Sequence, residues 1–223
     1  MITVHHLNNS RSQRVLWLLE ELGLPYEVKR YDRDPATLRA PAALRAVHPL
    51  GKSPVISDGT ATVAESGAIA EYLIEQRGGG ALRPAAGTKE RLRYTYWLHY
   101  AEGSLMPPLL MGLIAGRITA SPLPWFARPI ARRIAAGLRD GYVGPQVALH
   151  LDYIEQELTA QAWFAGADFS AADVQMSFPL QAAAARAGLD ARRPRITAWL
   201  ERIQARPAWQ RALAAGGPYA LLR

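Results

Sequence analysis

A strand, a helix and a second strand are predicted within the first 31 residues, and this order restricts the fold more than any other feature of the sequence. Residues 2–7 (ITVHHL) and 26–31 (YEVKRY) are typical of short strands. Between them, Val15, Leu18, Leu19 and Leu22 lie at the spacing of one helix face, and Gly23 ends the helix. Such a unit has a right-handed crossover and places its two strands parallel in one sheet.

A hairpin and another helix are predicted to complete this first region. After a less regular segment at residues 35–50, the strand-like runs PVIS and ATVA flank Asp58-Gly59, which is a good hairpin signal. The segment SGAIAEYLIEQR then has the pattern of a helix. Residues 1–77 therefore predict an α/β domain built as a βαβ unit followed by ββα.

The pattern changes at a stretch rich in glycine, proline and alanine. Residues 78–87 lack periodicity and predict an interdomain linker. Residues 88–223 predict a second domain made of helices only. Within it, Pro107-Pro108 is expected to kink or interrupt a long helix, and three prolines exclude a regular helix at residues 121–129. Ser170 and Asp173 have the spacing of a capping box at the start of a later helix.

Composition excludes several classes of protein. No apolar run reaches the roughly 18 residues of a membrane span, so we expect no membrane partner. The N-terminus lacks the features of a secretory signal, which indicates the cytoplasm. The chain has no cysteine, which excludes disulfides, thiolate metal sites and a thiol nucleophile of its own. His5 and His6 have no ligand partners at suitable spacing, so no metal site is predicted.

The net charge of +7 is compatible with nucleic acid, an anionic membrane or small acidic ligands as partners. Arg128, Arg132 and Arg139 share one helix face at spacings of four and seven. We interpret this face as solvated and expect no nucleic acid, because no recognised nucleic-acid-binding motif accompanies it.

Three short stretches carry candidate chemistry. The first joins strand to helix with small polar side chains, Asn8, Asn9, Ser10 and Ser12, although Ser10 to Gln13 is also a capping-box sequence. In the second, Pro54 opens a strand. The residues alone favour a trans bond, whereas a cis bond would turn the backbone of Val55 outward. In the third, Glu65 and Ser66 start a helix whose N–H groups suit an anion, with a plain N-cap as the alternative.

The order and spacing of these motifs resemble those of the cytosolic glutathione transferases over essentially the whole chain. The resemblance is carried by SRSQRVLWLLEELGLPYE, HPLGKSPVI, VAESGAIAEYL and FSAADV. Within that superfamily the sequence is most similar to bacterial and fungal members with a serine-type active site. The resemblance implies a thioredoxin-like N-terminal domain, a homodimer, and glutathione as co-substrate without any other cofactor.

The resemblance also implies roles for individual residues in binding glutathione. Pro54 would be the family's cis-proline, and the backbone of Val55 would pair with the cysteinyl part of the tripeptide. Glu65 and Ser66 would hold the γ-glutamyl end. The remaining assignments are Lys52 and His48 at the glycyl carboxylate, and Glu102 at the glutamyl amine bound to the other subunit.

The strand-to-helix join would then stabilise a visiting thiolate. Lowering a thiol pKa of about 8.5 by about two units requires roughly 2.7 kcal/mol, which one or two charge-assisted hydrogen bonds can supply. Ser10 is the first candidate donor, Asn9 the second and Ser12 the third; helix capping is an equally weighted alternative role for Ser10. If Asn9 dominates, disulfide reduction becomes more plausible than conjugation.

The predicted function is conjugation of glutathione to a hydrophobic electrophile held between the domains. Alternatives are a glutathione-dependent disulfide reductase or peroxidase, and a non-catalytic ligand-binding protein of the same fold. For the aromatic and apolar candidates at the second-substrate site, ordinary packing is the alternative role. These candidates are Tyr100, Met106, Met111, Trp125, Phe126 and Tyr219.

Overall fold

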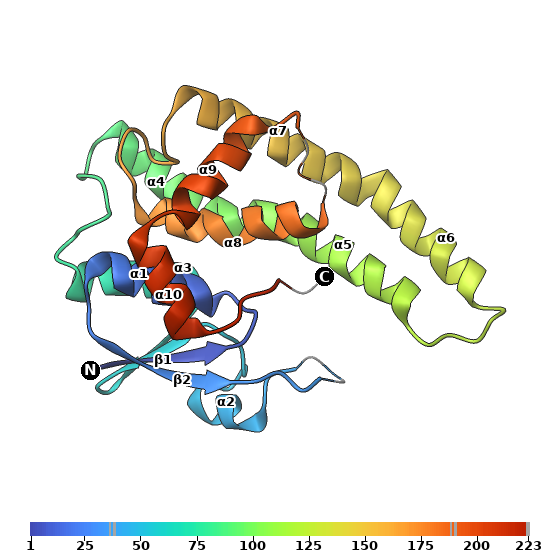
Figure 1. Ribbon diagram of the computed structural model, residues 1–223, viewed down its shortest axis with the longest axis horizontal. Helices are drawn as coiled ribbons and strands as arrows, with labels where there is room; N and C mark the ends of the chain where they lie inside the picture. The colour runs from blue at the N-terminus through green and yellow to red at the C-terminus, as the bar shows by residue number, and fades with distance from the viewer. Residues whose placement is uncertain (36, 38, 188, 190, 222–223) are drawn as a thin grey trace.

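The computed structural model describes residues 1–35, 37, 39–187, 189 and 191–221. A small sheet with its flanking helices forms the N-terminal part, and long helices form the rest of the molecule (Figure 1). Strand β1 (Ile2–Leu7), helix α1 (Ser12–Leu22) and strand β2 (Tyr26–Tyr31) follow one another as predicted. The two strands pair in parallel, with Ile2 opposite Tyr26, so the predicted crossover unit is confirmed.

The predicted hairpin is formed by β3 (Val55–Asp58) and β4 (Ala61–Ala64), which pair antiparallel. β3 also pairs antiparallel with β1, which gives the strand order β2-β1-β3-β4. The strand begins at Val55, because Pro54 before it has no N–H for the ladder. Helix α3 (Ser66–Tyr72) follows and continues into a π-helical turn, η1 (Leu73–Arg77).

One helix lies in the segment for which no regular structure was predicted. Helix α2 (Ala42–Val47) covers the face of the sheet opposite to α1 and α3 (Figure 1). Its single buried residue is Leu44, which forms a small cluster with Leu7 and Tyr31. A helix with one apolar anchor shows no 3.6-residue repeat, which explains why the sequence pattern did not reveal it.

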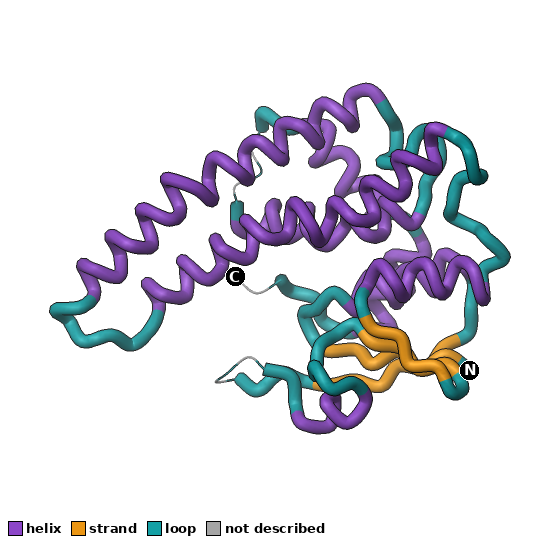
Figure 2. The backbone as a smooth tube through the Cα atoms, turned by 180° about the vertical axis from the view of Figure 1, so that it is seen from behind, coloured by secondary structure: helices purple, strands orange, loops and turns teal. Residues whose placement is uncertain are grey.

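Two long helical rods dominate the second part. Helix α4 (Lys89–Tyr100) passes through a π-helical turn, η2 (Ala101–Leu105), into α5 (Met106–Ala120). The proline pair thus lies in the first turn of α5, and the predicted interruption is confirmed. Helix α6 (Arg128–Leu138), a third π-helical turn η3 (Arg139–Val143) and α7 (Gly144–Ala160) form the second rod, which returns beside the first (Figure 2).

The predicted break between the rods was too long by two residues. Residues 121–127 are not helical, but α6 begins at Arg128, and Pro129 occupies its first turn. Proline is tolerated there because the first-turn N–H groups have no partner within the helix.

The chain ends with three shorter helices, α8 (Ala171–Arg186), α9 (Pro194–Gln204) and α10 (Pro207–Gly216). The predicted capping box is present at the start of α8. Helix α10 returns to the sheet domain and lies beside α1 (Figure 1). One core cluster therefore runs through both parts of the molecule, from Val4 and Trp17 to Trp97 and Trp199.

The predicted class, a thioredoxin-like α/β domain followed by a helical domain, is confirmed. Within the described part of the chain, no helix has the length and apolar character needed to cross a membrane.

Candidate functional site

A basic cavity of about 420 Å³ opens where the strand-to-helix join meets the loop before Pro54. Ser10 and Ser53 contribute hydroxyls to its wall. None of the described residues that line it is acidic, so the cavity favours an anionic ligand. Its cationic residues are Arg11, Arg33, Arg39, Arg45 and Lys52.

Ser10 is held at the wall of this basic cavity by neighbouring hydroxyls. Its Oγ lies 2.8 Å from Oγ of Ser12 and 3.3 Å from Oγ of Ser53, and it accepts the backbone N–H of Ser12 at 3.2 Å. The side chain is almost fully buried in the protein. These contacts fix the oxygen while the hydroxyl hydrogen can still rotate between acceptors.

His6 determines how the hydrogen bonds of this hydroxyl group are oriented. Burial lowers the pKa of His6 to about 4, so the ring is neutral at pH 7. Nδ1 of the ring lies 2.9 Å from Oγ of Ser12. In the neutral tautomer whose proton is on Nε2, Nδ1 accepts the hydrogen of Ser12. The hydrogen of Ser10 is then available to Ser12, Ser53 or a ligand.

Ser12, the third candidate donor to sulfur, lies deeper than Ser10. It is fully buried, and its hydroxyl contacts His6. The capping box from Ser10 to Gln13 does not form. The residue at the cap position of α1 is Arg11, and the amide of Gln13 is buried without a hydrogen-bond partner among the described residues.

Asn9 faces a different part of the molecule. Its backbone is left-handed, with φ of 49°, a conformation that asparagine adopts more readily than most residues. Its side-chain Oδ1 accepts the backbone N–H of Ala220 at 2.8 Å. Asn9 thus ties the join to the C-terminal segment, and only its amide hydrogens remain for other partners.

Glu102, predicted to act at the other subunit, binds two guanidinium groups of its own chain. Both of its oxygens accept from Nε of Arg11, at 2.9 and 3.0 Å, and Oε1 also accepts from Arg14. Burial opposes its ionisation, but Arg14 and Arg11 together hold the pKa of Glu102 below its usual range. The carboxylate thereby positions Arg11 at the basic cavity.

Arg14 connects the two domains through the same group of residues. It is buried on α1 and donates to the carbonyl of Gln175 at 2.6 Å and to Oγ of Ser66 at 2.9 Å. Gln175 also donates to Ser66, at 3.2 Å. Because Ser66 accepts both bonds, its own hydrogen is free to donate toward the start of α3.

Comparison with known proteins identifies the family. Residues 10–76 match the family model for the glutathione S-transferase N-terminal domain, and residues 142–207 match that for the C-terminal domain. The chain is 39% identical to glutathione S-transferase 3 of Schizosaccharomyces pombe over 93% of this chain and 85% of the relative. It is 34% identical to glutathione S-transferase 1 of Saccharomyces cerevisiae over 91% and 90%. The chain belongs to the glutathione transferase family.

Solved structures of other transferases share the whole fold. A glutathione S-transferase from Actinobacillus pleuropneumoniae has a TM-score of 0.78 and 36% identity, covering 96% of this chain and 92% of that one. A sphingomonad glutathione S-transferase, solved in complex with glutathione, has a TM-score of 0.74 and 25% identity, covering 96% and 98%. This chain is therefore a glutathione transferase, the enzyme class that the resemblance implied.

Among the remaining residues predicted to bind glutathione, Lys52 lines the basic cavity. His48 does not line it, although its carbonyl accepts the N–H of Gly51, which does. The Ser53–Pro54 bond is cis, as the family resemblance implied and contrary to the trans bond that the residues alone favoured. Val55 is buried at the start of β3, with His5 and Ala64 as its register partners.

Glu65 stands out because its backbone is strained. Its φ of 72° lies in the left-handed region, which residues other than glycine, asparagine and aspartate adopt only rarely. The residue is exposed immediately before α3, next to Ser66. Residues with strained backbone conformations occur preferentially at ligand-binding sites, so the strain is compatible with the predicted role of Glu65 at the γ-glutamyl end of glutathione.

The residues predicted to bind a second substrate do not form a site. Tyr100 and Met106 are core residues, each 6% exposed, and Tyr100 bonds His150. Trp125 and Phe126 lie at the exposed tip between α5 and α6, and Met111 is also on the surface. Tyr219 alone lies at the domain boundary, where its hydroxyl donates to Gln181 at 3.1 Å.

Sequence reasoning missed four arginines of the basic cavity: Arg11, Arg33, Arg39 and Arg45. Arg11 carried a signal, because a cation at a helix N-terminus is unfavourable unless it has a partner or a ligand. The other three come from the segment after β2, and no local pattern predicts that they converge. Among the described residues, no group of three or more histidine, aspartate or glutamate side chains is placed to hold a metal.

Proposed function

We propose that this transferase binds glutathione in the basic cavity and adds its thiolate to a hydrophobic electrophile. The observation that carries the proposal is the position of Ser10 at the wall of a cavity lined by five cationic residues. Glutathione has two carboxylates and one ammonium group, so its thiolate form carries a net charge of −2. Each cation favours that form over the thiol.

Ser10 would act as the hydrogen-bond donor to sulfur. When glutathione binds, its thiol loses a proton to solvent, and the hydroxyl hydrogen of Ser10 turns toward the thiolate. Ser12 N–H supports the oxygen of Ser10 during this change. A hydrogen bond to a charged acceptor contributes about 1.5–3 kcal/mol, which corresponds to about one to two units of thiol pKa.

The electrophile then reacts with a positioned nucleophile. With an aryl halide, the sulfur electron pair forms the new C–S bond and the halide leaves with the pair of the broken carbon–halogen bond. The protein holds the two reactants together and stabilises the thiolate. No proton has to be supplied by the protein in this step.

The γ-glutamyl end would bind at the start of α3. Glu65 is exposed there and suits the ammonium group, and the hydroxyl of Ser66 has a free hydrogen for the carboxylate. Lys52 would meet the glycyl carboxylate from the opposite loop, and the backbone of Val55 would pair with the cysteinyl residue. His48, outside the cavity wall, is no longer assigned a contact.

The test is glutathione binding followed by turnover. Calorimetry should show binding, and ultraviolet difference spectra should show thiolate absorbance at neutral pH. Conjugation of 1-chloro-2,4-dinitrobenzene should exceed reduction of a small disulfide or a hydroperoxide. Turnover of only the latter two would replace conjugation by reductase or peroxidase activity, and binding without any turnover would indicate a ligand-binding protein.

We also propose that the chain forms a homodimer. The long rods carry large apolar side chains that are exposed in a single chain, among them Ile114, Ile130 and Ile134. Large apolar side chains that are exposed on neighbouring helices are a feature of protein interfaces. Sedimentation should give twice the chain mass of 24.5 kDa, and Ile134→Glu should shift the protein toward the monomer.

A further inference from the structure

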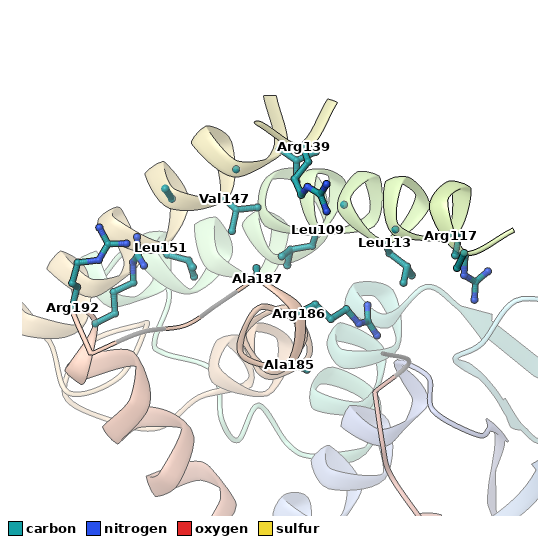
Figure 3. Close-up of a pocket in the computed structure, with 17 residues that line it drawn as sticks. Leu109, Leu113, Arg117, Arg139, Val147, Leu151, Ala185, Arg186, Ala187 and Arg192 are labelled. Atoms are coloured by element: carbon teal, nitrogen blue, oxygen red, sulfur yellow. The ribbon is translucent and has the colours of Figure 1, made fainter. Parts of the chain in front are cut away.

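A second cavity lies within the helical domain, and none of the predicted second-substrate residues lines it. This helical cavity has a volume of about 770 Å³ and is formed by α5, η3, α7 and the C-terminal end of α8. Its apolar wall comes from both rods and includes Leu109 and Leu113 of α5 and Val147 and Leu151 of α7 (Figure 3). A volume of this size suits a small organic molecule.

Arginines give the helical cavity a specific charge. Arg117, Arg139 and Arg186 line it, and none of its described lining residues is acidic. Arg139 has one weak ion pair, 3.7 Å from the exposed Asp140. Arg193 also lines the cavity and is paired with Asp152 at 2.8 Å. An apolar wall beside several guanidinium groups, with no carboxylate in the described lining, favours an amphipathic anion over a neutral molecule.

Two of these guanidinium groups have no partner within the described part of the chain. Nε of Arg186 is buried and makes no hydrogen bond. The guanidinium of Arg117 takes part in none of the hydrogen bonds or ion pairs among the described residues, and its backbone carbonyl accepts from Ser121. A buried donor without an acceptor is unfavourable, and a bound anion would remove that penalty.

Arg117 and Arg186 lie at the end of the helical cavity that is nearer the basic cavity. Their side chains extend on the same side in Figure 3, and Arg192 lies at the other end. Burial lowers the pKa of Arg33, a residue of the basic cavity, and the nearby charges of Arg11 and Arg117 lower it further. Burial likewise lowers the pKa of Arg186, and Arg117 adds to this effect. Arg117 therefore lines the helical cavity and lies near enough to Arg33 of the basic cavity for its charge to be felt there.

We propose that the second substrate of this transferase is an organic carboxylate whose apolar body packs in the helical cavity and whose carboxylate binds Arg117 and Arg186. This inference rests on the proposed function. The two guanidinium groups would also reduce the repulsion between an anionic electrophile and the glutathione thiolate. A neutral electrophile of the same shape would lack these contacts.

The test uses a matched pair of aryl chlorides, 2-chloro-5-nitrobenzoate and its methyl ester, in which the reactive carbon is next to the carboxylate and therefore on the side of the thiolate. In both, glutathione sulfur forms the C–S bond and chloride leaves with its electron pair. Each kcat/KM is divided by the uncatalysed rate constant with glutathione, which removes the difference in intrinsic reactivity. We expect the acid to be preferred by about tenfold, the factor associated with one charge-assisted hydrogen bond.

Single substitutions test whether Arg117 and Arg186 cause the preference for the acid over the ester. Arg117→Gln and Arg186→Gln should each lower the value for the acid by about tenfold and change that for the ester less than twofold. Arg132→Gln, on the exposed surface of α6 and outside the cavity, is the control and should change neither. Arg117 is exposed, so its variant tests the idea even if Arg186→Gln fails to fold.

These experiments distinguish a failure of the carboxylate assignment from a failure of the proposed function. Equal or greater preference for the ester, or an acid preference that both variants keep, overturns the carboxylate assignment and leaves the proposed function intact. If 1-chloro-2,4-dinitrobenzene is conjugated but neither matched compound is, the inference alone fails. If glutathione binds and none of the three is conjugated, the proposed function fails and the inference fails with it. A second measurement is calorimetry with glutathione-saturated protein, in which decanoate should bind at least tenfold more tightly than decanol; equal affinity overturns the assignment.

Discussion

At the scale of single residues, the oxygen of Ser10 is the atom on which the proposed chemistry depends most. Ser10→Ala removes the donor to sulfur but leaves the cationic residues of the cavity in place. We expect the pKa of bound glutathione to rise by about one unit and kcat/KM at pH 6.5 to fall about tenfold. Thiolate absorbance measured as a function of pH, on protein saturated with glutathione, checks the shift.

Two neighbouring variants make this prediction specific. Ser12→Ala keeps the Ser12 N–H that supports Ser10, so its effect on the thiol pKa should be smaller. Asn9→Ala should leave the pKa unchanged, because the Asn9 side chain contacts the backbone at Ala220. A pKa that moves with Asn9→Ala and not with Ser10→Ala would assign the donor role to Asn9.

Glu102 gives a prediction for stability. Glu102→Gln leaves Arg14 buried without its counter-charge, which we expect to lower the free energy of unfolding at pH 7 by about 2–3 kcal/mol. This is less than the 3–5 kcal/mol of a fully buried pair, because Glu102 is 31% exposed. Urea unfolding followed by circular dichroism measures the change. Glu75→Gln, in the exposed pair with Arg83, is the control and should cost less than about 1 kcal/mol.

The carboxylate of Glu102 also makes the free energy of unfolding depend on pH. Its folded pKa is lowered, so its contribution is fully present above the unfolded pKa of about 4.3 and is lost as the pH falls through the lower folded value. The difference in unfolding free energy between wild type and Glu102→Gln should therefore shrink below pH 4. A difference that stays constant down to pH 3 would show that the charge of Glu102 is not its cause.

At the scale of elements, the start of α8 depends on one buried carboxylate. Asp173 accepts from the N–H groups of Phe164 and Ser170, at 3.1 and 3.0 Å, and from Nε1 of Trp199 at 3.1 Å. All these partners are donors, so an amide would place its own N–H against them. We expect Asp173→Asn to cost about 3 kcal/mol and Ser170→Ala about 1 kcal/mol in denaturant unfolding. Similar costs for the two variants would contradict this account.

The elements also show what the sequence could predict. The β1–α1–β2 unit and the hairpin at Asp58-Gly59 follow from periodicity and turn chemistry, which are local. Helix α2 buries only Leu44, so its sequence has no 3.6-residue apolar repeat from which the helix could be predicted. The π-helical turns η1, η2 and η3 have no residue preference that a single sequence reveals.

The residues of the candidate site also fall into two groups: those that local sequence patterns predict, and those that only the tertiary structure brings to the site. Ser10 and Lys52 belong to motifs with a fixed spacing and were found. Arg33 and Arg45 reach the basic cavity only because β2 and α2 fold back beside the join, which is a property of the tertiary structure. Trp125 and Phe126 lie at an exposed tip, a position that the sequence could not reveal because an aromatic pair has the same sequence signature there as in the wall of a cavity.

At the scale of the whole molecule, the two domains share their core. Helix α10, at the end of the chain, packs on α1 of the first domain, and the rings of Trp17 and Trp209 meet edge to face at 5.0 Å. Arg206 and Arg211 bind Glu21 and Glu20 of α1 at the same contact. The predicted division at residues 78–87 therefore separates segments of sequence, whereas the C-terminal helix completes the surface of the N-terminal domain.

This shared core predicts a single unfolding transition. Loss of glutathione binding reports the first domain, and helical circular dichroism reports mainly the second; both should change at the same temperature and urea concentration. Trp209→Ala, which leaves a cavity against Trp17, should lower the unfolding free energy by about 3–5 kcal/mol and shift both signals together. Leu92→Ala, at an exposed position on α4, is the control and should shift neither. If Trp209→Ala shifts only the helical signal, or if the wild type shows two separated transitions, the domains unfold independently.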